Sequence, residues 1–411
     1  MSANLKLALR VLGRRKVFTA ISLVGITLTL VVLVLASTIM DNMFAPAAPE
    51  SRLDRIVAVK MVSEYGHDID FGSNPGYAFL KQTVFNLPHA DRVAIYSEIM
   101  AGVVYDGSRR IEAHLKHADG NYWNILDFHF VEGGPFSMAD NDADRNVVVM
   151  SESMRDKVFG RTHAVGRTLN VGGRSYRVVG VVSPAAITRE AAYAQLWVPI
   201  GTLNAEERSA VLGRFNALVL AHSRADIPAM KREFQSRVAR VPVEDPKQFT
   251  GFRAGLDTTF ESFSRNMTDN HHGDSAPTIV RATLAGAALL FMLLPALNLV
   301  ALNMSRILER APEIGVRKAF GAPRRTLVMQ FVMENIVLTL IGGVVAFFMA
   351  IVALRLLAGN VPYLDSSMSI NWRVFLYGMA ASAVFGVISG AWPAWRMSRL
   401  DPVNALRGGS R

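Results

Sequence analysis

The sequence predicts an α-helical membrane protein with four transmembrane helices and a large α+β extracytoplasmic domain inserted between helices 1 and 2. Three observations support this fold class. The 411-residue chain contains four apolar stretches long enough to cross a bilayer, which takes about 20 helical residues. The first two stretches are separated by a segment large enough to form a core of its own. Lysine and arginine are concentrated in the segments that would lie on one side of the membrane, as the positive-inside rule predicts.

The four apolar stretches contain a single charged residue, Glu334. A buried helix of a soluble protein rarely needs more than about 14 such residues in a row, so membrane spans are the better interpretation. The first stretch follows basic residues and could be taken for a signal peptide. Its apolar run exceeds the roughly 7 to 15 residues of a signal sequence, so we interpret it as a retained anchor. The stretches are Val17–Met40, Ala282–Met304, Thr326–Leu354 and Val374–Trp395.

The net charge of +10 is distributed unevenly along the chain. Residues 41–280 hold 26 Lys and Arg against 29 Asp and Glu, a net charge of −3, so the remainder carries +13. That excess lies before the first stretch, between the second and third, and after the fourth, which predicts that these three segments and both termini are cytoplasmic. The basic pI therefore reflects membrane topology, and we expect no nucleic-acid partner.

These observations predict a division of the chain into nine segments. In order they are a cytoplasmic amphipathic N-terminal helix (1–16), transmembrane helix 1 (17–40), the extracytoplasmic domain (41–280), transmembrane helix 2 (281–304), a cytoplasmic loop (305–325), transmembrane helix 3 (326–358), a short external loop (359–372), transmembrane helix 4 (373–395) and a cytoplasmic tail (396–411).

The extracytoplasmic domain has the pattern of a mixed α and β fold. Asp106-Gly107 separates two predicted strands, over 92–104 and 109–117, and Gly172-Gly173 separates two more, over 168–171 and 175–182. Each pair predicts a hairpin turn. Ser151 is a candidate N-cap for a helix that Gly160 ends, and Asp226 is a candidate N-cap for a helix over 227–238. Residues 242–277 are too polar and irregular to assign. The chain has no cysteine, so this domain must be stabilised by packing alone.

Several motifs resemble those of the MacB/FtsX family of ABC transporter permeases. The segment PEIGVRKAFG at Pro312–Gly321 resembles the signature of that family, and the order of motifs in the inserted domain resembles its MacB-like periplasmic domain. One span, a large outer domain and three further spans also match its topology. The other matching motifs are Gln330-Phe331, Glu334, Phe136-Ser137, Val147–Val149, Phe159-Gly160, Val165–Arg167, Tyr176–Val182, Pro393, Arg396, Asp401-Pro402 and Ala405–Arg407.

The resemblance implies mechanotransmission, in which ATP hydrolysis by two ATPase subunits beneath a permease dimer drives motions of the outer domains. The expected substrate is an amphiphile such as a peptide, antibiotic, lipid or lipoprotein, which is exported or extracted outside the membrane. The alternative is an FtsX-like regulator that activates an extracytoplasmic partner without transporting a substrate. Expected partners are an ABC ATPase dimer, a second permease copy or paralogue, membrane lipid, and a periplasmic adaptor with an outer-membrane channel.

The chain contains no G-x-x-x-x-G-K-[ST] sequence, which a P-loop needs to hold nucleotide phosphates. We therefore expect no enzyme activity and no cofactor in this chain, with ATP and Mg bound by the partner ATPase. The expected location is the bacterial inner membrane. No catalytic residue or metal site is predicted, since His271-His272 lies in a polar segment without a helical metal-binding spacing.

The candidate functional sites are two groups of residues and one single acid. The coupling contact with the ATPase is assigned to the cytoplasmic loop, where the alternative is that its charges only satisfy the positive-inside rule. Glu334 is an acid within a span, for which we weighed a hydrogen-bonding anchor against a proton relay. On the fourth span, small residues recur every fourth position and would allow close helix packing within one subunit or in a dimer. The coupling residues are Glu313, Ile314, Gly315, Arg317, Lys318 and Gly321, and the packing residues are Gly378, Ser382, Gly386 and Gly390.

Overall fold

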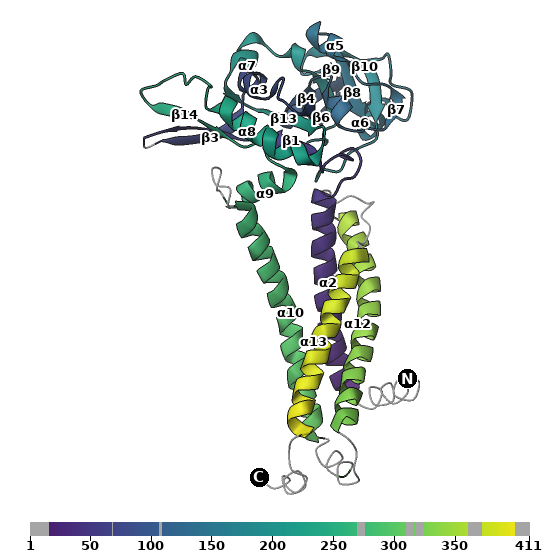
Figure 1. Cartoon of the computed structure of the whole chain (residues 1–411). Coiled ribbons are helices and arrows are strands. Elements are labelled where there is room, and N and C mark those ends of the chain that lie inside the picture. Colours follow the sequence, from purple (N-terminus) through teal and green to yellow (C-terminus); the bar gives the residue numbers. More distant parts are fainter. Residues whose placement is uncertain are drawn as a thin grey trace. The chain divides into compact units, whose positions relative to one another are not determined.

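The computed structural model describes residues 16–67, 69–106, 109–268, 276–309, 316, 324–360 and 372–398. The chain divides into two compact units, a helical unit formed by residues 1–41 and 282–411 and an inserted domain formed by residues 42–281 (Figure 1). The predicted N-terminal amphipathic helix, most of the cytoplasmic loop, most of the external loop and most of the C-terminal tail lie outside the described residues.

Long helices make up the helical unit. Among the described residues, two of them contain a stretch long and apolar enough to cross a membrane, over Thr19–Phe44 and Val332–Leu357. The other two contain shorter apolar stretches, over Ala276–Phe291 and Phe375–Val384, so the four predicted spans are not all established. The helices are α2 (Lys16–Phe44), α10 (Ala276–Glu309), α12 (Arg324–Asn360) and α13 (Trp372–Ser398).

Helices α2 and α12 pack closely because glycine lies at their contact. A Cβ atom on Gly342 would lie 2.8 Å from Cγ2 of Ile26 and 3.3 Å from its Cβ, so no larger residue fits without movement. The hydroxyl of Thr27 donates to the carbonyl oxygen of Gly342 at 3.3 Å across the same contact. Ile26 and Leu30 of α2 are buried with Leu338 of α12, as expected for helices that associate through small residues.

The inserted domain begins with strands and ends with a helix. Its strands are β1 (Ile56–Val59), β2 (Val62–Gly66), β3 (Asp70–Pro75), β4 (Ala90–Ser97), β5 (Met100–Asp106), β6 (Arg109–Ala118), β7 (Phe130–Gly133), β8 (Val147–Ser151), β9 (Thr168–Val171), β10 (Arg174–Val182), β11 (Leu196–Pro199), β12 (Leu212–Gly213), β13 (Phe215–Ala221) and β14 (Phe249–Ala254). Its helices are α3 (Tyr77–Val84), α4 (Tyr122–Ile125), α5 (Met138–Asp142), α6 (Glu152–Phe159), η1 (Ile200–Thr202), α7 (Ala205–Ser209), η2 (Arg224–Asp226), α8 (Ile227–Val238) and α9 (Thr259–Thr268).

The described strands form two sheets. The larger sheet follows the order β1-β13-β4-β6-β11-β8-β10-β9-β5, and β5 also pairs with β6. The strands from β6 to β5 therefore close into a ring, which leaves them no open edge. Val148, Leu169 and Val178 lie in one buried cluster with other side chains of the ring strands and of α6. The smaller sheet has the order β12-β3-β2-β14 and is antiparallel throughout.

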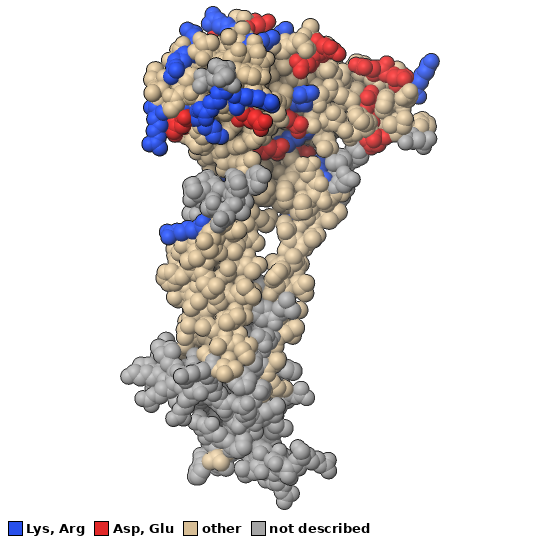
Figure 2. All heavy atoms as spheres, turned by 180° about the vertical axis from the view of Figure 1, so that it is seen from behind, with Lys and Arg blue, Asp and Glu red and all other residues tan. Residues whose placement is uncertain are grey.

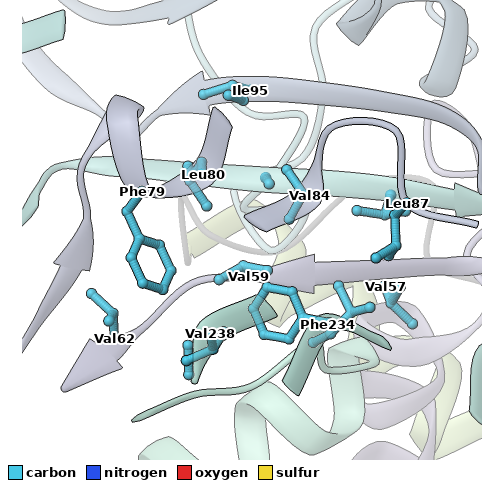
Figure 3. Packing of buried hydrophobic residues seen from close by; sticks show 14 of the residues in the cluster. Val57, Val59, Val62, Phe79, Leu80, Val84, Leu87, Ile95, Phe234 and Val238 are labelled. Carbon is cyan, nitrogen blue, oxygen red and sulfur yellow. The ribbon is translucent and has the colours of Figure 1, made fainter. Parts of the chain in front are cut away.

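A hydrophobic core lies where α3 and α8 pack against the strands. Phe79, Leu80 and Val84 of α3 meet Phe234 and Val238 of α8 over β1 (Figure 3). Each of these five side chains is buried, and their spacing follows one face of each helix, as expected for amphipathic helices on a sheet. This core is separate from an aromatic cluster around Trp123 and Trp197, whose ring centroids are 5.8 Å apart.

Several local predictions are confirmed. The Ser151 side chain accepts from the backbone N–H of Met154, Gly160 has φ of +66°, and the Gly172-Gly173 turn joins paired strands with φ of +58° and +85°. The helix over 227–238 is present, but Asp226 makes no side-chain cap there. Its carboxylate instead accepts from Ser223, in the capping box of the preceding 3-10 helix.

One local prediction is wrong, and the structure shows regular elements in the segment that the sequence left unassigned. We expected one strand over 92–104, but the structure has β4 and β5, which separate at Glu98-Ile99 because β4 pairs with β13 while β5 pairs with β9. The unassigned segment 242–277 contains β14 and α9.

Charged side chains are concentrated on the inserted domain. Figure 2 shows acidic and basic residues over its surface, whereas the described surface of the long helices is almost free of them. This separation follows the apolar composition of the helices, because a charge facing lipid is costly.

Candidate functional site

The predicted ATPase-coupling residues lie outside the described residues. Glu313, Ile314, Gly315, Arg317, Lys318 and Gly321 all fall in the loop that the structure leaves undescribed. Their assignment stays a prediction.

Glu334 lies near the start of α12 with its side chain 2% exposed. The next residue, Asn335, is equally buried, and its carbonyl oxygen accepts from the hydroxyl of Thr339 at 2.9 Å. Val337 and Leu338, on the following turn, are buried with residues of α2. The acid is therefore enclosed within the helical unit, where both of the roles considered for it remain open.

The predicted small-residue face belongs to α13. Gly378 is buried, and a Cβ there would lie 2.8 Å from Cδ2 of Leu33 on α2. This contact lies within one chain. Ser382 is half-buried, and the surroundings of Gly386 and Gly390 lie outside the described residues, although both belong to the helix.

The inserted domain contains a site that the sequence did not indicate, where its first and last described segments meet. The lead-in segment, residues 42–50, contains the end of α2, and α9 closes the domain before α10. Phe44 contacts Phe260 and Phe263 of α9 with ring centroids 5.4 and 5.2 Å apart, both edge to face. Such aromatic pairs contribute about 0.5–1.5 kcal/mol each beyond area burial.

A loop between β10 and β11, residues 183–195, holds the lead-in segment in place. We call it the clamp loop. Arg189 in this loop is 4% exposed, pairs with Glu50 at 3.3 Å and donates to the carbonyl oxygen of Ala45 at 2.9 Å. Next to it, the hydroxyl of Thr188 donates to the side-chain oxygen of Asn42 at 3.2 Å. These contacts join residues that are about 140 positions apart in the chain.

A second charged group fixes the other side of the clamp loop. Lys60 pairs with Glu190 at 2.6 Å, and the buried ammonium of Lys116 donates to the carbonyl oxygens of Glu190 and Ala191. The Lys116 nitrogen also lies 5.0 Å from the ring centroid of Tyr96. Carbonyl and ring contacts partly replace the water that this cation has lost.

Burial changes the ionisation of this junction. It raises the pKa of Glu50 above 4.5, although Arg189 opposes the change. It lowers the pKa of Lys116 to about 7, and the nearby Glu190 opposes that change. The charge of Lys60 lowers the pKa of the Glu190 carboxyl. Groups with such shifts are typical of functional sites, although structural ion pairs produce them too.

Helix α9 is anchored to the domain by two ion pairs. Glu261 pairs with Lys231 of α8 at 2.6 Å, and Arg265 pairs with Asp257 at 2.9 Å. Glu261 also accepts from the backbone and hydroxyl of Thr258, which completes a capping box. The Thr-x-x-Glu spacing at 258–261 was the sequence signal that would have located α9. Nothing comparable marks Arg189 or Glu50, because their pairing is a long-range contact.

The junction encloses a cavity of about 120 Å³ between the lead-in segment, the clamp loop, β1 and α9. A neighbouring cavity of about 110 Å³ shares four of its lining residues, Lys60, Glu190, Ser262 and Asn266. No cluster of three potential metal ligands occurs in the part of the chain that the structure describes, and His271-His272 lies outside that part. The junction thus combines a buried ion pair between segments that are distant in the chain with two cavities of small-molecule size.

Comparison with known proteins finds two matching family models. Residues 19–237 match the MacB-like periplasmic core domain, and residues 285–402 match the FtsX-like permease C-terminal region. Together these matches extend over most of the chain, and the first ends before β14 and α9 begin.

Individual relatives are distant. The chain is 24% identical over 316 residues to the uncharacterized ABC transporter permease YknZ of Bacillus subtilis, covering 77% of this chain and 74% of YknZ. It is 26% identical over 280 residues to the macrolide export ATP-binding/permease protein MacB of Bdellovibrio bacteriovorus, covering 66% of this chain but only 40% of that protein. Among solved structures, the periplasmic region of MacB from Actinobacillus actinomycetemcomitans aligns with a TM-score of 0.37 and 16% identity, over 53% of this chain and 94% of that one.

Proposed function

This chain belongs to the MacB/FtsX family of ABC transporter permeases, and on that premise we propose that it couples ATP hydrolysis by a separate ATPase to motions of its inserted domain. The domain would lie in the periplasm and the four long helices would cross the inner membrane, with both termini in the cytoplasm. The permease would act as a dimer with a second copy or a paralogue.

The single observation that carries this proposal is the junction of the inserted domain. The segment that leads into the domain and the helix that ends it are held together by Phe44, Phe260 and Phe263, and the clamp loop fixes the lead-in segment through Arg189. Because these contacts are buried, a displacement of α2 or α10 would move the domain as a body instead of fraying its first and last segments.

The sequence indicates which subunit would bind the nucleotide. The 411 residues contain no P-loop, so ATP and Mg would be bound by a partner ATPase dimer. We propose that Glu313, Arg317 and Lys318, with Ile314, Gly315 and Gly321, form the contact through which that ATPase acts.

The proposed substrate is an amphiphile, such as a peptide, antibiotic, lipid or lipoprotein, that is exported or extracted on the periplasmic side. The name of the Bdellovibrio relative records macrolide export, which supports this class. The chain spans only 40% of that relative's length, so its activity is carried over here as part of the proposal. A periplasmic adaptor and an outer-membrane channel are further proposed partners. We found no feature of the described residues that favours the regulatory alternative.

Copurification tests the ATPase partner. We expect the tagged chain to recover an ABC ATPase from native membranes, and the Glu313→Ala, Arg317→Ala double variant to lose it or to uncouple its hydrolysis. The exposed Arg110→Ala is the matched control and should behave as wild type. Recovery of no ATPase by the wild-type chain would contradict the proposal.

Distance measurements test the motion itself. The chain has no cysteine, so a spin label at Arg161→Cys in the inserted domain and another at Val344→Cys on α12 would report on these two sites alone. Both positions are exposed, at 91% for the Arg161 side chain and 58% for Val344. We expect ATP with vanadate to change the measured distance distribution in the assembled complex. An unchanged distribution during active hydrolysis would refute mechanotransmission through this domain.

A further inference from the structure

Two adjoining cavities within the inserted domain differ in chemical character. The first has mainly apolar walls, including Phe44 of the lead-in segment, Ile56 of β1, Leu126 and Phe263 of α9. Its volume of about 120 Å³ is close to the roughly 150 Å³ of an engineered apolar cavity that takes up benzene. It therefore has room for an aromatic ring or a short branched chain.

The second cavity is polar and its lining favours positive charge. In the second cavity the acids Glu98, Glu190 and Asp257 outnumber the bases Lys60 and Arg265, whereas Glu50 of the first cavity is paired with Arg189. Both bases are already engaged, Lys60 with Glu190 at 2.6 Å and Arg265 with Asp257 at 2.9 Å. A further cation is thus better accommodated here than a further anion.

Ser262 of α9 lies where the two cavities meet, because it lines both. Its hydroxyl oxygen is buried and, among the described residues, has no hydrogen-bond partner. A buried polar atom left without a partner destabilises the fold, and such atoms commonly bond to water or to a ligand. The hydroxyl is therefore a ready partner for the polar group of a bound molecule.

We propose that these cavities together form a binding site for a small amphiphilic amine, with its apolar group in the first cavity and its ammonium in the second. The apolar group would contact Phe44, Leu126 and Phe263. The ammonium would lie near Glu190 and donate a hydrogen bond to the Ser262 hydroxyl oxygen. Binding of the amine to these cavities does not require that the chain act as a transporter.

The site also has a regulatory consequence, which rests on the proposed function. Its walls include the lead-in segment at the start of the domain, α9 near its end, and the clamp loop, which holds the lead-in segment through Arg189. A ligand that contacts all three and binds only their packed arrangement stabilises it, by an amount that grows with the logarithm of the ligand concentration once that concentration exceeds the Kd. The amine would therefore change the coupling between the ATPase and the domain.

A single introduced cysteine provides the test. In the full chain, Ser262→Cys places the only thiol at the meeting point of the cavities, and its rate of modification by a small methanethiosulfonate reagent is measured. The probes are 2-phenylethylamine, 2-phenylethanol and phenylacetate, which share an apolar group and differ in charge. We expect the amine to slow modification about tenfold at ten times its Kd, the alcohol to act more weakly and the acid not to protect.

Two controls keep the result specific. Ser175→Cys on the exposed part of β10 should be modified at the same rate with and without each probe. On the wild-type chain, the amine should raise the unfolding temperature, and Ala191→Leu, which fills the first cavity, should abolish that rise. Absence of protection by the amine, or equal protection at Ser175→Cys, would overturn the site, and equal protection by phenylacetate would overturn its preference for cations. None of these measurements needs an ATPase, so their failure is distinguishable from failure of the proposed function.

Discussion

Replacing Arg189 by methionine removes the cation of the clamp loop but keeps most of its apolar stem. Glu50, with its side chain 6% exposed, would then lose the guanidinium that lies 3.3 Å away. The backbone carbonyl of Ala45 would lose its donor as well. The backbone of the lead-in segment would be unchanged, but the segment would lose its ion pair and hydrogen bond to the clamp loop.

The cost can be worked out from this burial. Breaking a buried ion pair by removing one partner costs about 3–5 kcal/mol, because the other charge is left uncompensated. Glu50 can avoid the full cost by taking up a proton, since burial already raises its pKa and Arg189 no longer opposes the change. Its folded-state pKa then lies above the unfolded value, so the deficit of Arg189→Met relative to wild type grows as pH rises, by at most about 1.4 kcal/mol per pH unit.

Unfolding of the full chain in detergent at several pH values between 5 and 8.5, followed by tryptophan fluorescence, measures this deficit. For a domain of this size, a loss of about 4 kcal/mol lowers the unfolding temperature by roughly 8–16 °C. The double variant Glu50→Gln, Arg189→Met should recover most of the loss, because replacing both partners of a buried pair is often nearly neutral. Arg110→Met, at a side chain 64% exposed, should change the unfolding temperature little.

Two results would refute this reasoning. A deficit below about 1 kcal/mol at pH 8 would show that the pair contributes no more than a surface ion pair. A double variant as unstable as Arg189→Met would show that the loss comes from packing or from the Ala45 hydrogen bond and not from the unpaired carboxylate.

Three further predictions concern single sites. Burial lowers the pKa of Lys116 from 10.5 to about 7, so between these pH values the unfolded state binds more protons and stability rises with pH. Lys116→Met should flatten that rise when unfolding is measured at several pH values. An unchanged slope would count against the burial of Lys116 as its cause. Gly342→Ala should lower the thermal stability of the helical unit, and Ile26→Leu, which removes the Cγ2 methyl from Cβ, should restore part of the loss if the 2.8 Å contact is responsible. Gly172→Val should destabilise the domain by about 1–2 kcal/mol because its φ is +58°, whereas Gly172→Asn should cost less; equal losses in denaturant unfolding would point to packing instead.

The parts of the fold that the sequence predicted well are those set by local interactions. Ser151 and Gly160 mark the ends of α6, and Gly172-Gly173 marks a hairpin, because caps and positive φ values depend on a few neighbouring residues. The single strand expected over 92–104 failed because the separation of β4 and β5 depends on which distant strands they pair with. The closed ring formed by the strands from β6 to β5 likewise depends on pairing between strands that are distant in the sequence.

The sequence by itself determined that the chain carries stretches long and apolar enough to span a membrane around a large inserted domain, and it identified the family. The apolar stretches and the family motifs can both be read from residues that lie close together along the chain. The apolar stretches are recognised by their length, because the hydrophobic thickness of a bilayer sets how many residues a span needs. Only the tertiary structure decided where the domain is fastened. Arg189 and Glu50 are 139 positions apart, and Phe44 meets Phe260 from the opposite end of the domain, so no local pattern could pair them. Their pairing depends on the burial that the folded sheets create.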